Sequence, residues 1–143
     1  MVRPVLMLIS VFSVLCGCSA RDVVTHRYDS LASARADQLF AKGWLPDILP
    51  PSAHTIVTTN DLDLNTSDGE FSFLPEDFEA FRSHGAAYAP ATAAPPSVGD
   101  EAKRQLRDGG DVSQYRVGGS TWIFFCQPAR GHCAYTMWLA QPS

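Results

Sequence analysis

The feature that most constrains the fold is a pair of cysteines, Cys126 and Cys133, each at one end of an apolar run. Residues 120–126 and 133–140 are rich in β-branched and aromatic side chains, a composition typical of β-strands. The segment between them, 127–132, contains Pro and Gly, as turns do. If the two thiols face each other across an antiparallel pair, the whole register follows, because side chains alternate with a period of two. The sequence therefore predicts a C-terminal β-hairpin with a fixed register.

This register divides the hairpin into two faces. The pairs expected on the core face are Phe124 with Tyr135 and Trp122 with Met137, and those on the opposite face are Phe125 with Ala134, Ile123 with Thr136 and Thr121 with Trp138. The opposite face keeps three large apolar side chains, Ile123, Phe125 and Trp138, which is more than a solvated face needs. Two interpretations stay open: a surface that binds a protein partner, or a face covered by helices.

The start of the chain carries an export signal. Residues 5–15 are apolar, Arg3 precedes them, and the run is shorter than the ~20 residues that cross a bilayer. It ends in Leu15-Cys16-Gly17-Cys18, which resembles the lipobox of bacterial lipoproteins. The resemblance implies cleavage after Gly17, a diacylglyceryl thioether on Cys18 and acylation of the new amino group. The other interpretation is an ordinary signal peptide, with Cys18 free or in a disulfide.

The lipobox also implies an organisation and a place. We expect a signal peptide over 1–17, a lipidated tether over 18–28 and a single domain over 29–143. Triacylation gives stable anchoring, which one acyl chain alone does not. By the sorting rule of enteric bacteria, Ser19 after the lipidated cysteine favours the outer membrane, with the domain facing the periplasm.

Export also bears on the two remaining cysteines. Cys126 and Cys133 form an even pair in an oxidising compartment, where disulfides persist. The rival interpretation is a metal site made of Cys126, His132 and Cys133. Zinc usually takes four ligands from spaced pairs, and the adjacent His132 and Cys133 offer poor geometry. The disulfide is the favoured interpretation.

The charge balance excludes some partners. The chain has 11 Lys and Arg against 15 Asp and Glu, a formal net charge of −4. Nucleic-acid binding needs a basic patch, and docking on anionic lipid needs a basic segment. We therefore expect no nucleic-acid partner, and membrane attachment through the lipid anchor alone.

Hydrophobic periodicity gives the remaining elements. Helices are predicted over 30–42, 75–84 and 97–107, and strands over 54–64, 70–73 and 114–117, in addition to the hairpin at the C-terminus. Asp68-Gly69 is the expected pivot of a hairpin between the first two of these strands. The predicted fold class is α+β: an antiparallel sheet of about five strands with two or three helices packed mainly on one face.

A calcium loop is one interpretation of the 61–69 segment, because calcium binds several oxygens at alternate positions of a tight loop. The oxygen donors at such positions are Asp61, Asp63 and Asn65. An EF-hand-like loop needs Gly at its sixth and Glu at its twelfth position, and Thr66 and Ser72 stand there instead. The polar end of a hairpin is the favoured interpretation.

Several short motifs together carry a family resemblance. They are Gly43-Trp44-Leu45-Pro46-Asp47, Leu49-Pro50, Ser52-Ala53, Asn60-Asp61-Leu62-Asp63 and Gly69-Glu70-Phe71-Ser72-Phe73. In combination they resemble the YbbD-like group of small bacterial proteins, often lipoproteins, over about residues 30–81. The resemblance implies a lipoprotein and a fold unit, and it implies no chemistry.

No catalytic motif accompanies these features, since the chain has no nucleophile elbow or related strained turn. We expect no enzyme and no cofactor. The expected function is a membrane-anchored envelope lipoprotein that acts through contacts with another envelope protein. The alternatives are a structural lipoprotein with no single ligand and a small calcium-binding module.

Overall fold

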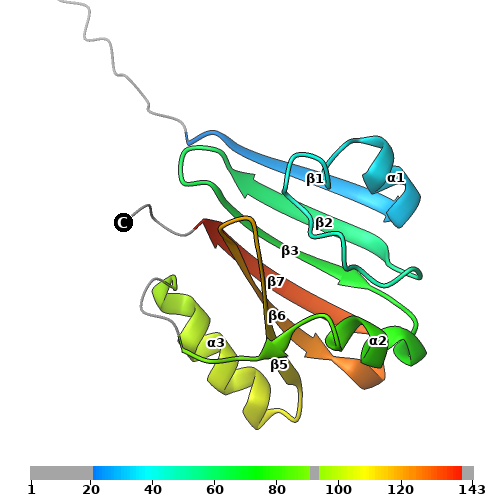
Figure 1. Cartoon of the computed structure of the whole chain (residues 1–143), viewed down its shortest axis with the longest axis vertical. Coiled ribbons are helices and arrows are strands. Elements are labelled where there is room, and N and C mark those ends of the chain that lie inside the picture. The colour runs from blue at the N-terminus through cyan, green and yellow to red at the C-terminus, as the bar shows by residue number, and fades with distance from the viewer. Residues whose placement is uncertain (1–20, 91–93, 140–143) are drawn as a thin grey trace, which may run out of the picture.

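The computed structural model describes residues 21–90 and 94–139, which form one antiparallel sheet with three short helices (Figure 1). The strands are β1 (Val23–Ser30), β2 (His54–Asp61), β3 (Thr66–Ser72), β4 (Ala86–Ala87), β5 (Asp111–Val117), β6 (Ser120–Gln127) and β7 (His132–Leu139). The helices are α1 (Leu31–Ala36), α2 (Phe78–Arg82) and α3 (Pro96–Arg107), and η1 (Pro75–Asp77) and η2 (Pro128–Arg130) are single 3-10 turns. The strand order is β1-β2-β3-β7-β6-β5-β4.

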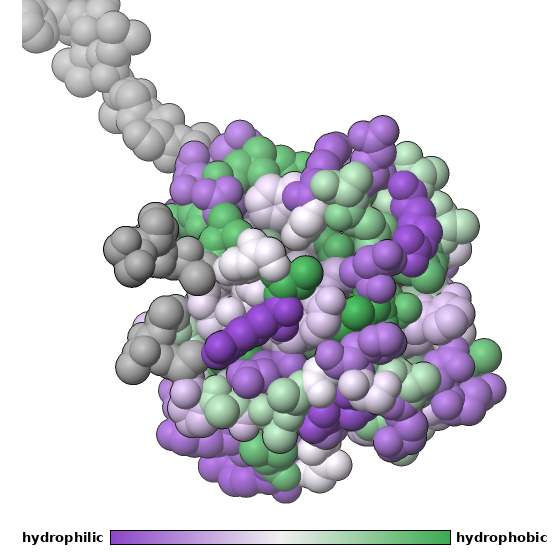
Figure 2. Space-filling model, in the orientation of Figure 1, coloured by the Kyte–Doolittle hydropathy of each residue, from purple (hydrophilic) through white to green (hydrophobic). Residues whose placement is uncertain are grey.

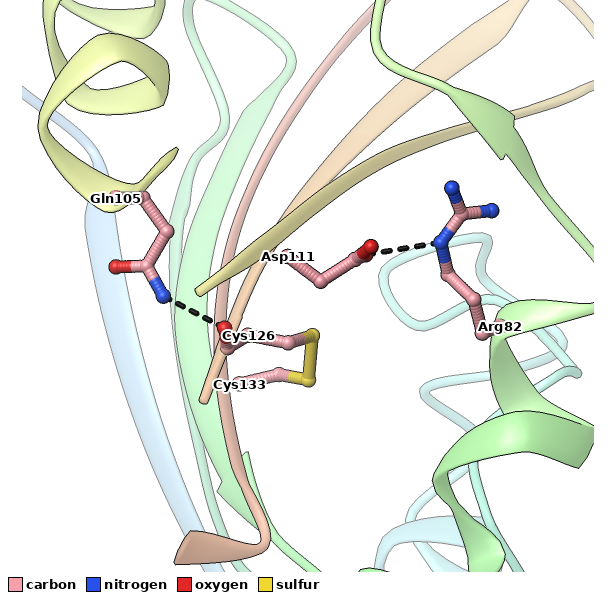
Figure 3. A network of polar contacts seen from close by, with 5 residues as sticks. All are labelled: Arg82, Gln105, Asp111, Cys126 and Cys133. Carbon is pink, nitrogen blue, oxygen red and sulfur yellow. Dashed lines mark hydrogen bonds and ion pairs between the residues drawn. A yellow bond between two sulfur atoms is a disulfide. The ribbon is translucent and has the colours of Figure 1, made fainter. Parts of the chain in front are cut away.

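The predicted fold class was wrong in two respects. The sheet has seven strands, not about five, and it dominates the structure, while the helices are small. They also lie on both faces: α1 and α2 pack on one core, and α3 packs on a second core across the sheet. In Figure 3, Gln105 of α3 and Arg82 of α2 lie on opposite sides of the strands.

The two strands that the prediction missed are both at sheet edges. β1 pairs only with β2, and its exposed and half-buried residues alternate without an apolar run. β4 has two residues and pairs only with β5. Edge strands bury little side-chain surface, so they leave a weak periodic signal. From Val23 onward, the segment expected as a tether over 18–28 belongs to the sheet.

The C-terminal hairpin has the predicted register. Cys126 lies opposite Cys133, Phe124 opposite Tyr135 and Phe125 opposite Ala134. The predicted core face is also correct, since Trp122, Phe124, Tyr135 and Met137 are all buried in one cluster. A short apolar hairpin with one fixed pair leaves no freedom of register.

The β2–β3 hairpin exists, but the predicted pivot at Asp68-Gly69 was wrong. The turn lies between Asp61 and Thr66, and Asn65 has the left-handed φ of 51°. Gly69 lies within β3, where a Cβ would come within 2.2 Å of the Val57 carbonyl oxygen and 2.7 Å of the Tyr135 ring. Gly69 therefore lets β2 and the Tyr135 ring approach the β3 backbone closely, which is a known role of glycine inside strands.

The helices differ from the predictions mainly in length. Ser30 caps α1 as expected, with its side chain accepting from the Ser33 amide, but the helix stops at Ala36. Gln38 then takes a φ of 61°, which a helix cannot continue through. The predicted 75–84 helix is split into η1 and α2, whereas α3 spans nearly the predicted range.

Two hydrophobic clusters occupy the two faces of the sheet. The larger one joins the aromatic residues of β3, β6 and β7 to α1, α2 and the proline-rich segment between α1 and β2. Leu45 and Leu49 of that segment are buried, and Trp44 and Ile48 are half-buried. The smaller cluster lies under α3. α3 covers only part of its face, and this leaves the surface described next.

Candidate functional site

The candidate site is the face of β1, β2, β3 and β7 that α3 leaves open. One row of this face crosses the sheet through Thr25, Thr59, Asp68, Thr136 and Ile123, each opposite the next on the neighbouring strand. The first four are exposed or half-buried, and Ile123 is buried. The row therefore changes from polar to apolar at the strand where α3 begins to cover the sheet.

The neighbouring row shows the same change. It runs from Arg27 through Val57, Glu70 and Ala134 to Phe125. Phe125 is buried, whereas Arg27 and Glu70 are exposed. Antiparallel sheets often leave one face in water, and this one does so over four strands.

Cross-strand polar pairs fix the side chains of the open face. The Thr136 hydroxyl donates to the Asp68 carboxylate at 2.6 Å. His132 Nε2 lies 3.6 Å from the Glu70 carboxylate. Such pairs stabilise a sheet by a few tenths of a kcal/mol to about 1 kcal/mol each. The open face is thus an ordered polar surface.

A groove runs between this face and α3. It consists of two adjoining cavities of about 300 and 430 Å³, and both are lined by Glu101, Phe125 and Ala134. Asp68 lines the first cavity, and Arg130 the second. The groove has an apolar floor, an acidic end and a basic end, which are the features of a site for a polar chain segment.

The structure places the predicted partner residues beneath α3. Ile123, Phe125 and Trp138 are only 1%, 6% and 6% exposed. Val98 and Ala102 of α3 pack against them. These residues therefore form the second core, from which only the edge of Phe125 reaches the groove. The helix-covered interpretation is the one that the structure supports.

The predicted disulfide joins Cys126 to Cys133 at the end of the β6–β7 hairpin. The Gln105 side-chain amide of α3 donates to the Cys126 carbonyl oxygen at 2.7 Å (Figure 3). Both thiols are used in the disulfide, so they are not free to bind a metal with His132. Within residues 21–90 and 94–139, no group of three or more His, Cys, Asp or Glu could hold a metal ion.

The turn beyond the disulfide is held against the end of β3. Gly131 has a φ of 58°, and its carbonyl oxygen accepts from the Phe73 amide at 2.8 Å. A Cβ at Gly131 would come within 2.0 Å of the Phe73 carbonyl oxygen. On the other side of the sheet, Arg82 of α2 pairs with Asp111 of β5 at 2.9 Å (Figure 3). These contacts fix the β6–β7 end of the molecule.

The carboxylates of the 61–69 segment serve its own backbone. Asp61 Oδ1 accepts from the amides of Asp63 and Leu64 at 3.1 and 3.0 Å. Asp63 Oδ2 accepts from the Asp22 amide at 3.3 Å, and Asp68 accepts from a β7 side chain. The Asp61 and Asp63 carboxylates, two of the three candidate calcium ligands, therefore accept hydrogen bonds from the backbone of the turn and of the residue before β1.

Two tyrosines carry shifted pKa values. Burial raises the pKa of Tyr135 above its ordinary value, against a smaller lowering effect of the Ser67 hydroxyl. Partial burial raises the pKa of Tyr28 to about 12, and the hydrogen bond that its hydroxyl donates to Asp37 adds to this shift. Both hydroxyls hold their protons more tightly than a free tyrosine does, so neither is activated as a base.

The sequence reasoning missed the open face, because its residues belong partly to β1, which was expected as a tether. Val24, His26 and Tyr28 of β1 are half-buried and alternate with exposed residues, but the sequence has no apolar alternation there that would have indicated a strand. The predicted lipidation residue, Cys18, lies outside the described residues. Among the residues that are described, no helix has the length and apolar character needed to cross a bilayer.

Comparison with known families matches part of the chain. Residues 22–72 match the family model of the YbbD head domain. No curated protein and no solved structure matches the chain. The matched range begins and ends close to the first and last residues of the β1–β2–β3 unit, so it includes the missed edge strand. The chain thus carries a region similar to the YbbD head domain, and this supports a YbbD-like protein.

Proposed function

We propose that this protein is a bacterial envelope lipoprotein, anchored through Cys18, that binds another envelope protein through the open sheet face and the groove beside α3. The anchor rests on the lipobox resemblance of Leu15-Cys16-Gly17-Cys18. The outer membrane, facing the periplasm, is the proposed place because Ser19 follows the lipidated cysteine. We propose no catalytic activity for the protein.

The observation that carries the proposal is the partial cover of the sheet. α3 buries Ile123 and Phe125 of β6 and Trp138 near the end of β7. On the same face, the described residues of β1, β2 and β3 and the preceding residues of β7 are exposed or half-buried. The uncovered side meets α3 at a groove whose floor includes Phe125 and Ala134. A groove with an apolar floor and polar walls suits a protein segment, since side-chain burial supplies affinity and the polar walls supply orientation.

The charges indicate which segment fits. Asp68 lines only the first cavity and Arg130 only the second, and Glu101 lies where the two adjoin. A bound segment with a basic side chain at the first end and an acidic one at the second would complement both. Complementary charges favour encounter and fix the register of a complex more than they raise affinity.

Site-specific photocrosslinking in cells tests this proposal. A photoreactive residue at Asp68, on the open face, should give a discrete crosslinked species. The matched control is Glu79 of α2, an exposed acid that belongs to the other side of the sheet. We expect no such species from the control position.

The outcomes separate the alternatives. Identical crosslinking patterns from Asp68 and Glu79 would contradict binding through the open face. A complete lack of discrete species at both positions would favour a structural lipoprotein with no single partner.

A further inference from the structure

Exposed apolar side chains gather at one end of the sheet. Seven large apolar residues are exposed in the described part of the chain, and five of them share this end. We call these five the apolar rim: Val23, Leu62, Leu64, Val117 and Leu139. The other two, Leu74 and Leu106, lie after β3 and on α3. An uneven distribution of this kind marks a contact surface more strongly than single exposed residues do.

The topology explains why the rim forms. The start of β1, the β2–β3 turn, the β5–β6 turn and the end of β7 lie at the same end of the antiparallel sheet (Figure 1). Val23 pairs with Asp61, and Ser120 pairs with Leu139. Figure 2 shows apolar residues among the polar ones at this edge, on the left of the view.

The β2–β3 turn presents its leucines in a fixed conformation. Asp61 Oδ1 accepts from the Leu64 amide, and the Leu62 amide donates to the Asp22 carbonyl oxygen at 3.0 Å. The two leucine side chains are 40% and 56% exposed. Their exposure is therefore built into the turn and does not result from loose packing.

Two further residues at this end are typical of membrane interfaces. Lys42 and Trp44 line a cavity of about 130 Å³ together with Asn65 of the β2–β3 turn and Leu139 of the rim. Trp is enriched at the headgroup level of bilayers, and Lys reaches its charge outward along an apolar stem. This end of the sheet thus combines the aliphatic rim with an aromatic and a basic side chain.

We propose that the apolar rim rests on the surface of the lipid bilayer. This inference rests on the proposed function, because the anchor sets the geometry. Only Ser19 and Ala20 lie between Cys18 and Arg21. Three extended residue steps span about 10 Å at most, so an acylated Cys18 keeps Arg21, beside the start of β1 at the rim end, within that distance of the lipid.

The contact is apolar rather than electrostatic. Charged residues of both signs surround the rim: Asp22, Asp61 and Asp63 are acidic, and Arg21, Lys42 and Arg116 are basic. Exposed acids oppose docking on an anionic surface, whereas aliphatic side chains partition into the interface of a zwitterionic one. With the rim on the lipid, the opposite end of the sheet, with the disulfide, points away from the membrane.

Quenching of Trp44 fluorescence by brominated lipid tests the proposal. The full-length, lipidated protein is reconstituted in phosphatidylcholine vesicles with or without bromine near the headgroup end of the acyl chains. We expect quenching of the wild type. The Trp44→Phe variant should lose it, since the other two tryptophans, Trp122 and Trp138, are buried.

Matched leucine variants show whether the rim makes the contact. Leu62→Ser with Leu64→Ser removes two of the five rim side chains, so quenching should fall roughly twofold or more. Leu74→Ser with Leu106→Ser changes two leucines of similar exposure elsewhere, 51% and 55%, and should leave quenching unchanged. Equal quenching in both double variants, or none in the wild type, would overturn the proposal.

This experiment tests the lipid anchor and the contact of the rim with lipid separately. Intact-mass analysis of the same sample reports acylation of Cys18. An acylated protein whose Trp44 is not quenched would overturn the rim contact and leave the anchor standing. An unacylated Cys18 would overturn the anchor and, with it, the placement of the rim on lipid.

Discussion

Replacing Phe125 with Ala separates a core role from a binding role for the face beneath α3. Phe125 is 6% exposed and packs in one cluster with Val98, Ile123 and Trp138. A buried Phe→Ala change costs about 3–5 kcal/mol in unfolding free energy. We expect the lower value, about 3 kcal/mol, because Phe125 also borders the groove, where part of the cavity is already open to solvent.

Urea unfolding of the purified protein, followed by circular dichroism, measures this loss. With a slope of about 1.5 kcal/mol/M, a loss of about 3 kcal/mol lowers the midpoint by about 2 M. The control is Leu106→Ala on α3, the helix that covers this face; Leu106 is 55% exposed, so its replacement should change stability by no more than about 0.5 kcal/mol. If Phe125→Ala proved as stable as Leu106→Ala, α3 would not cover this face and the second core would not exist.

Three further changes test other parts of the structure. The double variant Cys126→Ser, Cys133→Ser should have an unfolding free energy about 2 kcal/mol below that of the wild type, because the disulfide closes a short loop. In urea unfolding, the wild type under reducing conditions should be as unstable as the double variant. A wild type whose stability is unaffected by reductant would refute this. Gly69→Ala should destabilise the protein by more than about 2 kcal/mol in a thermal melt, because the new Cβ would lie 2.2 Å from the Val57 carbonyl oxygen. A stability equal to that of the wild type would show that the spacing of β2 and β3 differs from this structure. The pKa of Tyr135 is raised in the folded state, so stability is full below pH ~10, the pKa of a free tyrosine, and falls as pH rises above it. In alkaline unfolding, Tyr135→Phe should lose less stability between neutral pH and pH ~11 than wild type does, and equal losses would contradict the assignment.

The strongest predictions from sequence came from the C-terminal hairpin. Cys126 and Cys133 fixed one pair, and the alternation of large apolar residues fixed the rest, so the register was confirmed in full. The helix over 97–107 was also confirmed, because its apolar positions Val98 and Ala102 fall on one face and are buried there. Where one side of an element is buried, periodicity carries the information.

The elements that the sequence did not predict have no fully buried side. β1 is held by pairing with β2, and its side chains remain partly exposed, so its sequence VVTHRYDS shows no buried face. Such a strand is defined by backbone hydrogen bonds to a neighbour distant in sequence, and composition does not report these. The position of the β2–β3 turn depended on the Asp61 side chain, which outweighed the Asp68-Gly69 signal.

The candidate site was the least predictable part. The sequence indicated an apolar surplus at Ile123, Phe125 and Trp138, which was predicted as a possible partner surface with cover by helices as the alternative. Which interpretation is correct depends on where α3 packs on the sheet, and local sequence patterns do not determine that position. The open face depends on the same fact, because it is defined by what α3 leaves uncovered.

Mass spectrometry of the mature N-terminus tests the central claim most directly. The proposed anchor predicts that native protein from bacterial membranes lacks Met1 to Gly17 and carries a diacylglyceryl thioether on Cys18, with a further acyl chain on its amino group. A native protein that retains its leader, or begins at or after Cys18 without acyl mass, would contradict the claim.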